Sequence, residues 1–402
     1  MSFLALDIQH GSNHMANGAS YIENLFVSLF GYPVAGTWWG AGIAIFAPCL
    51  AVFGFVNVFA LFAVWLERKV SAHMQCRLGP MEVGPHGALQ TIADGIKLTV
   101  KEDIIPKVAD KPLFIIAPMI VFAGTFIRFV PLPFSHNVVA ADLNLGLFFI
   151  AAVGAVEVLG VIMAGWSSNN KWSLLGTIRT ATQMVSYEIP IGIAFVTVAV
   201  SAGSLSLVDI VGQQQGWFFQ WFIFRNPFLM LITVVYFIAA LAECKRSPFD
   251  LPEAESELVS GFHTEYSGIR FALFFLAEYA AMYIVSAVAA VIFLGGWWTG
   301  IPFIDEIGMG EGASTFEVIV GLVIKAHALV GKAIAIVFVQ MWIRWTLPRV
   351  RLDQMMYLCW KVLLPISLVC LVGSAMWDLA IGAFAQSKEY FLFFIPEPVT
   401  PE

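Results

Sequence analysis

Long runs of apolar residues alternate with shorter polar connections along most of the chain. A helix needs about 20 residues to cross the hydrocarbon core of a bilayer, and eight of these runs are long enough to do so. Their unbroken apolar character differs from the alternating pattern of a transmembrane β-barrel, so the pattern predicts helices. The predicted spans lie near residues 41–66, 112–132, 146–166, 187–203, 227–244, 271–295, 316–343 and 358–385.

We therefore expect an all-α polytopic membrane protein with a single transmembrane domain over residues 41–385. Residues 1–40 are expected on the outer face, where YIENLFVSLF (21–30) has the apolar spacing of a surface helix. Residues 386–402 form a C-terminal tail. The first long connection predicts a shaped loop rich in glycine and proline, RLGPMEVGPHG, followed by an amphipathic helix over ALQTIADGIKLTVKEDIIP, residues 88–106.

The basic residues predict an orientation for these spans. Four connections, 67–111, 167–186, 245–270 and 344–361, hold sixteen of the twenty-one Lys and Arg residues. By the positive-inside rule these connections face the cytoplasm. Eight spans then place both termini on the outer, periplasmic face of the cell's inner or plasma membrane.

Composition and motifs exclude several functions. Hydrophobic residues make up 59% of the chain and charged residues only 12%, as expected of a membrane protein. The formal net charge of −7 argues against a nucleic-acid partner. The five cysteines are scattered, and the sequence has no dinucleotide fingerprint, P-loop or HExxH motif. We expect no metal site and no redox centre in this chain alone.

Several charged residues fall inside the apolar runs, where ionisable groups usually mark an ion or proton path. These are Glu157, Glu188, Glu278 and Lys332. The helical rise places three of them, all but Glu188, roughly 10–16 Å below the inner surface. We therefore expect Glu278 and Lys332 to face the bundle interior and to interact. Arg128 and Glu243 lie close to span ends, and we interpret them either as satisfied polar residues packed between helices or as side chains that reach the interface.

The connection before the sixth span concentrates acid beside the membrane. Two of its glutamates, Glu253 and Glu255, could simply complement the dipole of a helix that begins at Pro252. That explanation does not account for the further carboxylates nearby. Repulsion within such a cluster raises the pKa of some members, which suits proton exchange near neutral pH. The remaining carboxylates of this connection are Asp250, Glu257 and Glu265.

Four segments resemble one family, the H subunit of respiratory complex I, the proton-pumping NADH:quinone oxidoreductase. The similarity runs from about residue 60 to residue 370 and includes every basic connection. Many relatives read GPNRVGP where this chain has GPMEVGP, so Met81 and Glu82 depart from the family pattern. The segments are WLERKVSAHMQCRLGPMEVGPHGALQTIADGIKLTVKED, AGWSSNNKWSLLGTIRTATQMVSYE, ECKRSPFDLPEAESELVSGFHTEYSGIRFALFFLAEYAAM and IRWTLPRVRLDQMMYLCWKVLLP.

The resemblance implies a subunit between the peripheral and membrane arms that helps to shape a quinone tunnel and begins the proton route. The tunnel residues it implies are Arg77, Gly79, Arg246, Phe249 and Asp250. The proton-route residues it implies are Glu188, Glu253, Glu255, Glu265, Glu278 and the base Lys332, to which its depth in the membrane adds Glu157. Quinone would be the substrate. FMN and iron–sulfur clusters would lie in partner subunits, which include peripheral iron–sulfur and quinone-site subunits and small and antiporter-like membrane subunits.

Two alternatives remain open at this point. Related membrane subunits belong to complexes linked to ferredoxin, deazaflavin or a hydrogenase, and these would share the acidic residues. A stand-alone ion transporter would also use buried charges, although such proteins often contain two repeated halves, and no repeat is visible in this sequence. The electron donor and the kind of quinone are not written in this chain.

Overall fold

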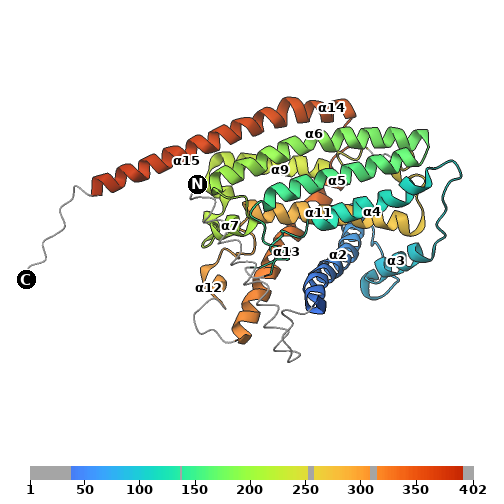
Figure 1. Ribbon diagram of the computed structural model, residues 1–402, viewed down its shortest axis with the longest axis horizontal. Helices are drawn as coiled ribbons and strands as arrows, with labels where there is room; N and C mark the ends of the chain where they lie inside the picture. The colour runs from blue at the N-terminus through green and yellow to red at the C-terminus, as the bar shows by residue number, and fades with distance from the viewer. Residues whose placement is uncertain (1–37, 136–137, 252–257, 308–314, 393–402) are drawn as a thin grey trace, which may run out of the picture.

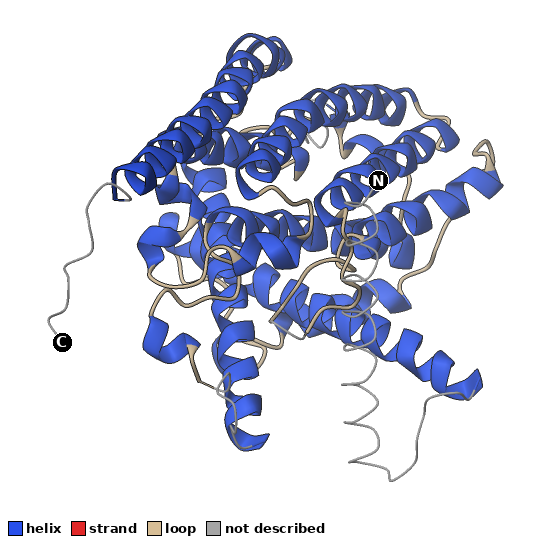
Figure 2. Cartoon of the chain, turned by 60° about the vertical axis from the view of Figure 1, so that its left-hand side comes forward, coloured by secondary structure: helices blue, strands red, loops and turns tan. Residues whose placement is uncertain are grey.

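The structure is a computed structural model that describes residues 38–135, 138–251, 258–307 and 315–392. The predicted N-terminal surface helix at residues 21–30 lies outside these ranges. Within them the chain is helical and contains no strand, only an isolated bridge between Ser135 and Val138. Figure 2 shows these helices joined by loops.

The helices are α2 (Trp38–Met74), α3 (Gln90–Val100), α4 (Lys111–Ile127), α5 (Gly146–Ser167), α6 (Lys171–Ala202), α7 (Leu207–Gly212), α8 (Phe222–Arg225), α9 (Pro227–Glu243), α11 (Gly268–Phe293), α12 (Pro302–Asp305), α13 (Thr315–Thr346), α14 (Leu352–Tyr357) and α15 (Leu364–Leu392). A π-helical turn, Leu358–Leu363, joins α14 to α15. Short 3₁₀ turns occur at Pro85–Gly87, Phe218–Gln220 and Gly261–His263.

Six of these helical stretches are long and apolar enough to cross a membrane: Cys49–Met74, Gly146–Ser167, Lys171–Ala202, Gly268–Phe293, Phe316–Thr346 and Leu352–Ala380. They confirm a polytopic helical membrane protein. The two remaining predicted spans correspond to the shorter apolar helices α4 and α9, so the count of eight stays a prediction.

The helix that contains the fourth predicted span begins well before that span. The apolar pattern predicts a span near 187–203 after a polar connection, but α6 begins at Lys171. The Asn170 side chain accepts a hydrogen bond from the Trp172 amide and so caps the helix start. Gly203, with φ of 68°, ends the helix in the left-handed conformation. The polar residues of the expected connection therefore occupy the N-terminal part of a long helix.

Helix α11 lies at the centre of the bundle. Most of its length is buried, and it packs against α2, α4, α9 and α13. Figure 1 shows α4, α5, α6, α9 and α11 running alongside one another, while α2 and α13 cross them steeply and α15 extends beyond the bundle. A central helix buried on all sides brings its polar residues, Glu278 and Tyr279 among them, into contact with several other helices.

The connections separate into two faces. At one end the first long connection meets the start of α11, where Arg270 pairs with Asp103 at 3.1 Å and the Ser267 hydroxyl bonds Glu102. This end carries α3, which confirms the predicted amphipathic helix. At the opposite end Gln214 donates to the carbonyl of Val291 near the end of α11. In Figure 1 α3 and α7 lie at these opposite ends.

Candidate functional site

The connection that follows α9 is joined by ion pairs to five different parts of the fold. We call residues 243–250 the junction segment. Its Glu243 pairs with Arg128 after α4 at 2.7 Å, and its Lys245 pairs with Glu157 of α5 at 3.2 Å. Arg246 pairs with residues of both α2 and α11, and Asp250 pairs with Arg349 after α13 at 3.4 Å. Few short loops contact so many elements through charge.

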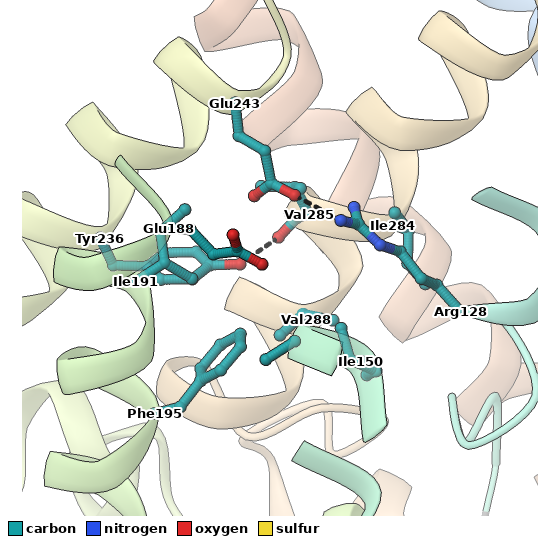
Figure 3. A pocket seen from close by; sticks show the side chains of 11 residues that line it. Arg128, Ile150, Glu188, Ile191, Phe195, Tyr236, Glu243, Ile284, Val285 and Val288 are labelled. Carbon is teal, nitrogen blue, oxygen red and sulfur yellow. Dashed lines mark hydrogen bonds and ion pairs between the residues drawn. The ribbon is translucent and has the colours of Figure 1, made fainter. Parts of the chain in front are cut away.

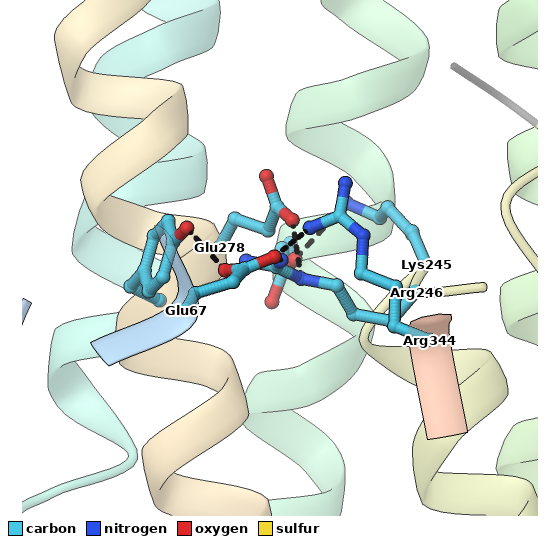
Figure 4. Close-up of polar contacts among 7 residues, drawn as sticks. Glu67, Lys245, Arg246, Glu278 and Arg344 are labelled. Carbon is cyan, nitrogen blue, oxygen red and sulfur yellow. Dashed lines mark hydrogen bonds and ion pairs between the residues drawn. The ribbon is translucent and has the colours of Figure 1, made fainter. Parts of the chain in front are cut away.

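Arg246 bridges two carboxylates in what we call the arginine cluster, Glu67, Arg246, Glu278, Tyr279 and Arg344 (Figure 4). Its Nη1 donates to both oxygens of Glu67 at 2.9 and 3.0 Å, and its Nε lies 2.8 Å from Glu278 Oε1. The Tyr279 hydroxyl donates to Glu67 at 2.6 Å, and Arg344 also bonds this carboxylate. Two guanidinium groups thus face two carboxylates in a buried site, so each charge is compensated.

A second group of charges borders a cavity of about 30 Å³, which is room for a water molecule. We call this cavity the acid pocket. Glu188 of α6 and Glu243 of α9 both line it, together with Arg128 and otherwise mostly apolar side chains (Figure 3). The Tyr236 hydroxyl donates to the Val285 carbonyl at 3.0 Å and forms part of the wall. Two carboxylates that share a small cavity with one guanidinium are suited to holding and passing a proton.

The pKa values of two junction residues are both raised, which favours the charged form of Arg246 and the neutral form of Asp250. Burial disfavours the charged form of Arg246, but the carboxylates of Glu278 and Glu67 outweigh it and raise the pKa of the guanidinium, which therefore stays protonated. Burial raises the pKa of Asp250, an effect that Arg349 and Arg344 partly offset. The segment therefore combines a permanent positive charge with a carboxyl group that accepts a proton more readily than usual.

The predicted tunnel residues lie in two separate connections of the chain. Phe249 is buried, with its ring 5.7 Å from that of Tyr187, and Asp250 follows it in the junction segment. Arg77 and Gly79 follow the C-terminal end of α2, the helix that also supplies Glu67. Arg77 is exposed and bonds Gln75, so the structure does not bring it into contact with the junction segment.

The predicted acidic relay is only partly covered by the structure. Glu253 and Glu255 lie outside the described residues. Glu265 accepts a hydrogen bond from Asn170 at 2.6 Å, which joins the third basic connection to the start of α6. Glu157 and Glu278 are both held in ion pairs with the junction segment, as a site in the bundle interior requires.

The predicted pairing of Glu278 with Lys332 is wrong. The Lys332 ammonium donates to the carbonyls of Leu294, Gly296 and Trp298 at 2.5, 3.1 and 2.5 Å, beyond the end of α11. Sixteen residues separate Glu278 from Leu294, which is about 24 Å of helix. The depth estimate assumes that both helices cross the bilayer alike, whereas α13 crosses the bundle steeply (Figure 1).

Of the two interpretations offered for Arg128 and Glu243, the structure confirms the first: both are paired polar residues packed between helices. Arg128 is 3% exposed, and the two residues pair with each other beside the acid pocket. The sequence pattern also gives no sign of the roles of Glu67, Tyr279 and Arg344. It places Glu67 at the first residue of a cytoplasmic connection, but α2 continues to Met74 and keeps this carboxylate within the helix.

The described residues offer no cluster for a metal ion or a redox centre. Among them, no group of three His, Cys, Asp or Glu side chains could hold a metal. The five cysteines are separate: Cys49 and Cys76 are exposed, while Cys244, Cys359 and Cys370 are buried in different places. These residues do not fit an iron–sulfur cluster, which needs four convergent thiolates or their equivalents.

Comparison with known proteins gives a consistent result. Residues 47–375 match the NADH dehydrogenase family. The chain is 51% identical to the H subunit of NADH-quinone oxidoreductase from Chlorobaculum parvum over 343 residues, which cover 85% of this chain and 93% of that protein. It is 45% identical to the H 2 subunit of the same enzyme from Cytophaga hutchinsonii, over 82% of this chain and 97% of the relative. The corresponding protein of Anaeromyxobacter dehalogenans is 44% identical, over 86% and 84%.

Proposed function

This chain belongs to the NADH dehydrogenase family, and we propose that it is the H subunit of a proton-pumping NADH:quinone oxidoreductase. In that role it forms part of the quinone tunnel and the first acidic proton route. The observation that carries this proposal is the junction segment, because a single short loop is ion-paired both to the arginine cluster and to the glutamates around the acid pocket.

The tunnel side of this mechanism uses Arg246, Phe249 and Asp250, with Arg77 and Gly79 contributed by the first connection. A quinone that is being reduced develops negative charge and needs protons. The protonated Arg246 attracts that charge. Burial raises the pKa of Asp250, so this carboxyl group is suited to take up a proton beside the quinone. We place Glu253, Glu255 and Glu265 at the start of the acidic route on the basis of the family resemblance.

The membrane side of the mechanism uses Glu278, Glu157, Glu243 and Glu188. A negative charge at the tunnel competes with Glu67 and Glu278 for Arg246, and so changes the balance of ion pairs in the arginine cluster. The junction segment carries that change to Lys245 and Glu243, which hold Glu157 and Arg128. Release of Glu243 from Arg128 would favour its protonation from the pocket it shares with Glu188. Lys332 lies outside this route.

We propose that electrons reach the quinone from FMN and iron–sulfur clusters in partner subunits, since the described residues of this chain include no cluster of side chains that could hold a metal centre. The partners would dock at the end that carries α3. Several apolar side chains of this helix are exposed there, Ile96 at 60% and Val100 at 80%. The basic connections at this end face the cytoplasm in our proposal, and both termini face outward.

Neutral variants of the pocket test this proposal. In the assembled complex, Glu243→Gln and Glu188→Gln should each lower quinone reductase activity and proton pumping together, because each removes a proton-carrying carboxyl group while keeping its size. A loss of about tenfold or more is expected for a proton-transfer residue. Both activities are measured in membrane vesicles with NADH as donor.

The same vesicles provide the control. NADH oxidation by an artificial acceptor such as hexaammineruthenium uses only the peripheral electron carriers and should stay at its wild-type rate. Wild-type pumping and quinone reduction in both variants would contradict the proposed proton route. Loss of the artificial-acceptor activity as well would indicate failed assembly, in which case Glu188→Asp and Glu243→Asp replace the glutamine variants.

A further inference from the structure

A buried glutamine on α6 holds both ends of the junction segment. Gln183 is fully buried, five residues before Glu188 on the same helix. Its Nε2 donates to the carbonyl of Ala242 at 2.7 Å and to the carbonyl of Phe249 at 2.9 Å. Because both neighbours are acceptors, the amide nitrogen must be the atom that faces them. One side chain thus fixes the distance between the start and the end of a charged loop.

The two carbonyls have different origins. Ala242 lies in the last turn of α9, and its carbonyl accepts a hydrogen bond from the Lys245 amide at 3.2 Å as well as from Gln183. Phe249 closes a turn in which its own amide donates to the Arg246 carbonyl at 2.8 Å. The Gln183 amide therefore positions Glu243, which directly follows Ala242, and also the turn that presents Arg246.

An amide is not needed here to fill space. The Oε1 atom of Gln183 is buried and has no hydrogen-bond partner among the described residues. A buried acceptor without a partner is destabilising, and an apolar side chain of the same length would avoid that effect. The amide stabilises this site only through its two donated hydrogen bonds.

We propose that Gln183 is a positioning residue that couples the arginine cluster to the acid pocket. It keeps Glu243 beside Arg128, and it keeps the turn that carries Arg246 between Glu67 and Glu278. A change of charge in the arginine cluster therefore displaces Glu243 in the acid pocket, and a change in the pocket displaces Arg246. The neighbouring residues of α6 reinforce this link, since the Tyr187 hydroxyl donates to the Met355 carbonyl at 2.9 Å while its ring faces Phe249. This inference rests on the proposed function of the pocket and the cluster.

The test replaces Gln183 by methionine, which has similar length but no donor. In the assembled complex we expect quinone reductase activity to fall about tenfold, as for the loss of hydrogen bonds that hold a reacting group in place. The number of protons pumped per electron should fall as well, and artificial-acceptor activity should remain. A merely structural glutamine would lower the amount of complex but leave the proton-to-electron ratio of each assembled complex unchanged.

Thr180→Val is the matched control, because Thr180 is buried one turn earlier on α6 and its hydroxyl donates to the Gly176 carbonyl of its own helix. It should leave the proton-to-electron ratio at the wild-type value. If Gln183→Met fails to assemble, Gln183→Asn, whose shorter amide reaches only one carbonyl, should give a reduced ratio. A wild-type ratio in the assembled Gln183 variant overturns the inference. If Glu243→Gln or Glu188→Gln is impaired in the same assay, the proposed function survives that result; if neither is impaired, both proposals fail.

Discussion

At the scale of single residues, Lys332 shows how the surroundings decide what a buried charge does. Its three N–H donors are all used by backbone carbonyls just beyond the end of α11, and its ammonium lies 4.1 Å from the Trp221 ring centre. A cation at this position complements the negative end of the helix dipole. The arrangement joins α13 to the end of α11 and leaves the ammonium no N–H group that is available for proton exchange.

We therefore expect Lys332→Met to weaken the fold rather than the proton route. The variant leaves partly buried carbonyls without a donor, which should lower stability by about 1–3 kcal/mol. The measurement is the midpoint of heat inactivation of the solubilised complex, with the proton-to-electron ratio determined before heating. An unchanged midpoint together with a reduced ratio would restore Lys332 to the proton route.

Residue positions alone could predict that Glu157 and Glu278 face the bundle interior, because hydrocarbon strongly disfavours an exposed charge. They could not predict the partners. Lys245 and Arg246 come from a loop 88 residues beyond Glu157 and 179 beyond Glu67, and helical periodicity carries no information about contacts at such separations. The sequence does not decide between the two interpretations of Arg128 and Glu243, because a position near a span end fits both a snorkelling side chain and a buried ion pair.

At the scale of elements, the 3₁₀ turn Gly261–His263 places a histidine against the first turns of α11. Burial among the rings of Phe262, Phe271 and Phe274 lowers the pKa of His263 to about 3, and nearby Lys245 acts in the same direction while Glu278 opposes it. Between pH 3 and 6.5 His263 is thus protonated in the unfolded chain but neutral in the folded chain. Acidification through this window destabilises the fold.

His263→Gln should make the complex less sensitive to acid. One proton contributes at most about 1.4 kcal/mol per pH unit, so the difference between variant and wild type should grow as the pH falls from 7 to 5. The measurement is the heat-inactivation midpoint at each pH. His327→Gln, at a less buried position on α13, serves as the control and should follow the wild type. Equal acid sensitivity in His263→Gln and wild type would show that His263 is not the group responsible.

The sequence could predict which segments are helices, because apolar runs and caps are local signals. It predicted the lengths of the helices less well. The N-terminal half of α6 is rich in threonine and serine, a composition that predicts a connection, yet it is buried against α5 and α9. Polar residues there bond backbone carbonyls, as Gln183 and Thr177 do, so packing between helices overrides the polarity that marks a loop.

At the scale of the whole molecule, the predicted separation into a basic and a non-basic face agrees with the arrangement of the elements. The junction segment, α3 and the start of α11 meet at one end, and α7 and α12 lie at the other (Figure 1). This agreement follows from charge, because a basic connection is retained on the cytoplasmic side during insertion whatever its tertiary contacts. The direction of the bundle across the membrane stays a prediction.

Single cysteines in a chain whose exposed Cys49 and Cys76 are replaced by serine can test that direction. Gln90→Cys and Ser260→Cys lie at the basic end and should react with a membrane-impermeant thiol reagent only in inside-out vesicles. Phe303→Cys, 82% exposed on α12, should react only in right-side-out vesicles. Chaotropic removal of the peripheral subunits uncovers any cysteine that a partner shields at the basic end. Labelling of residue 90 or 260 from outside would show that the bundle has the opposite orientation. The basic end, which carries the junction segment, would then face outward. The junction segment would be on the wrong side for proton uptake from the cytoplasm.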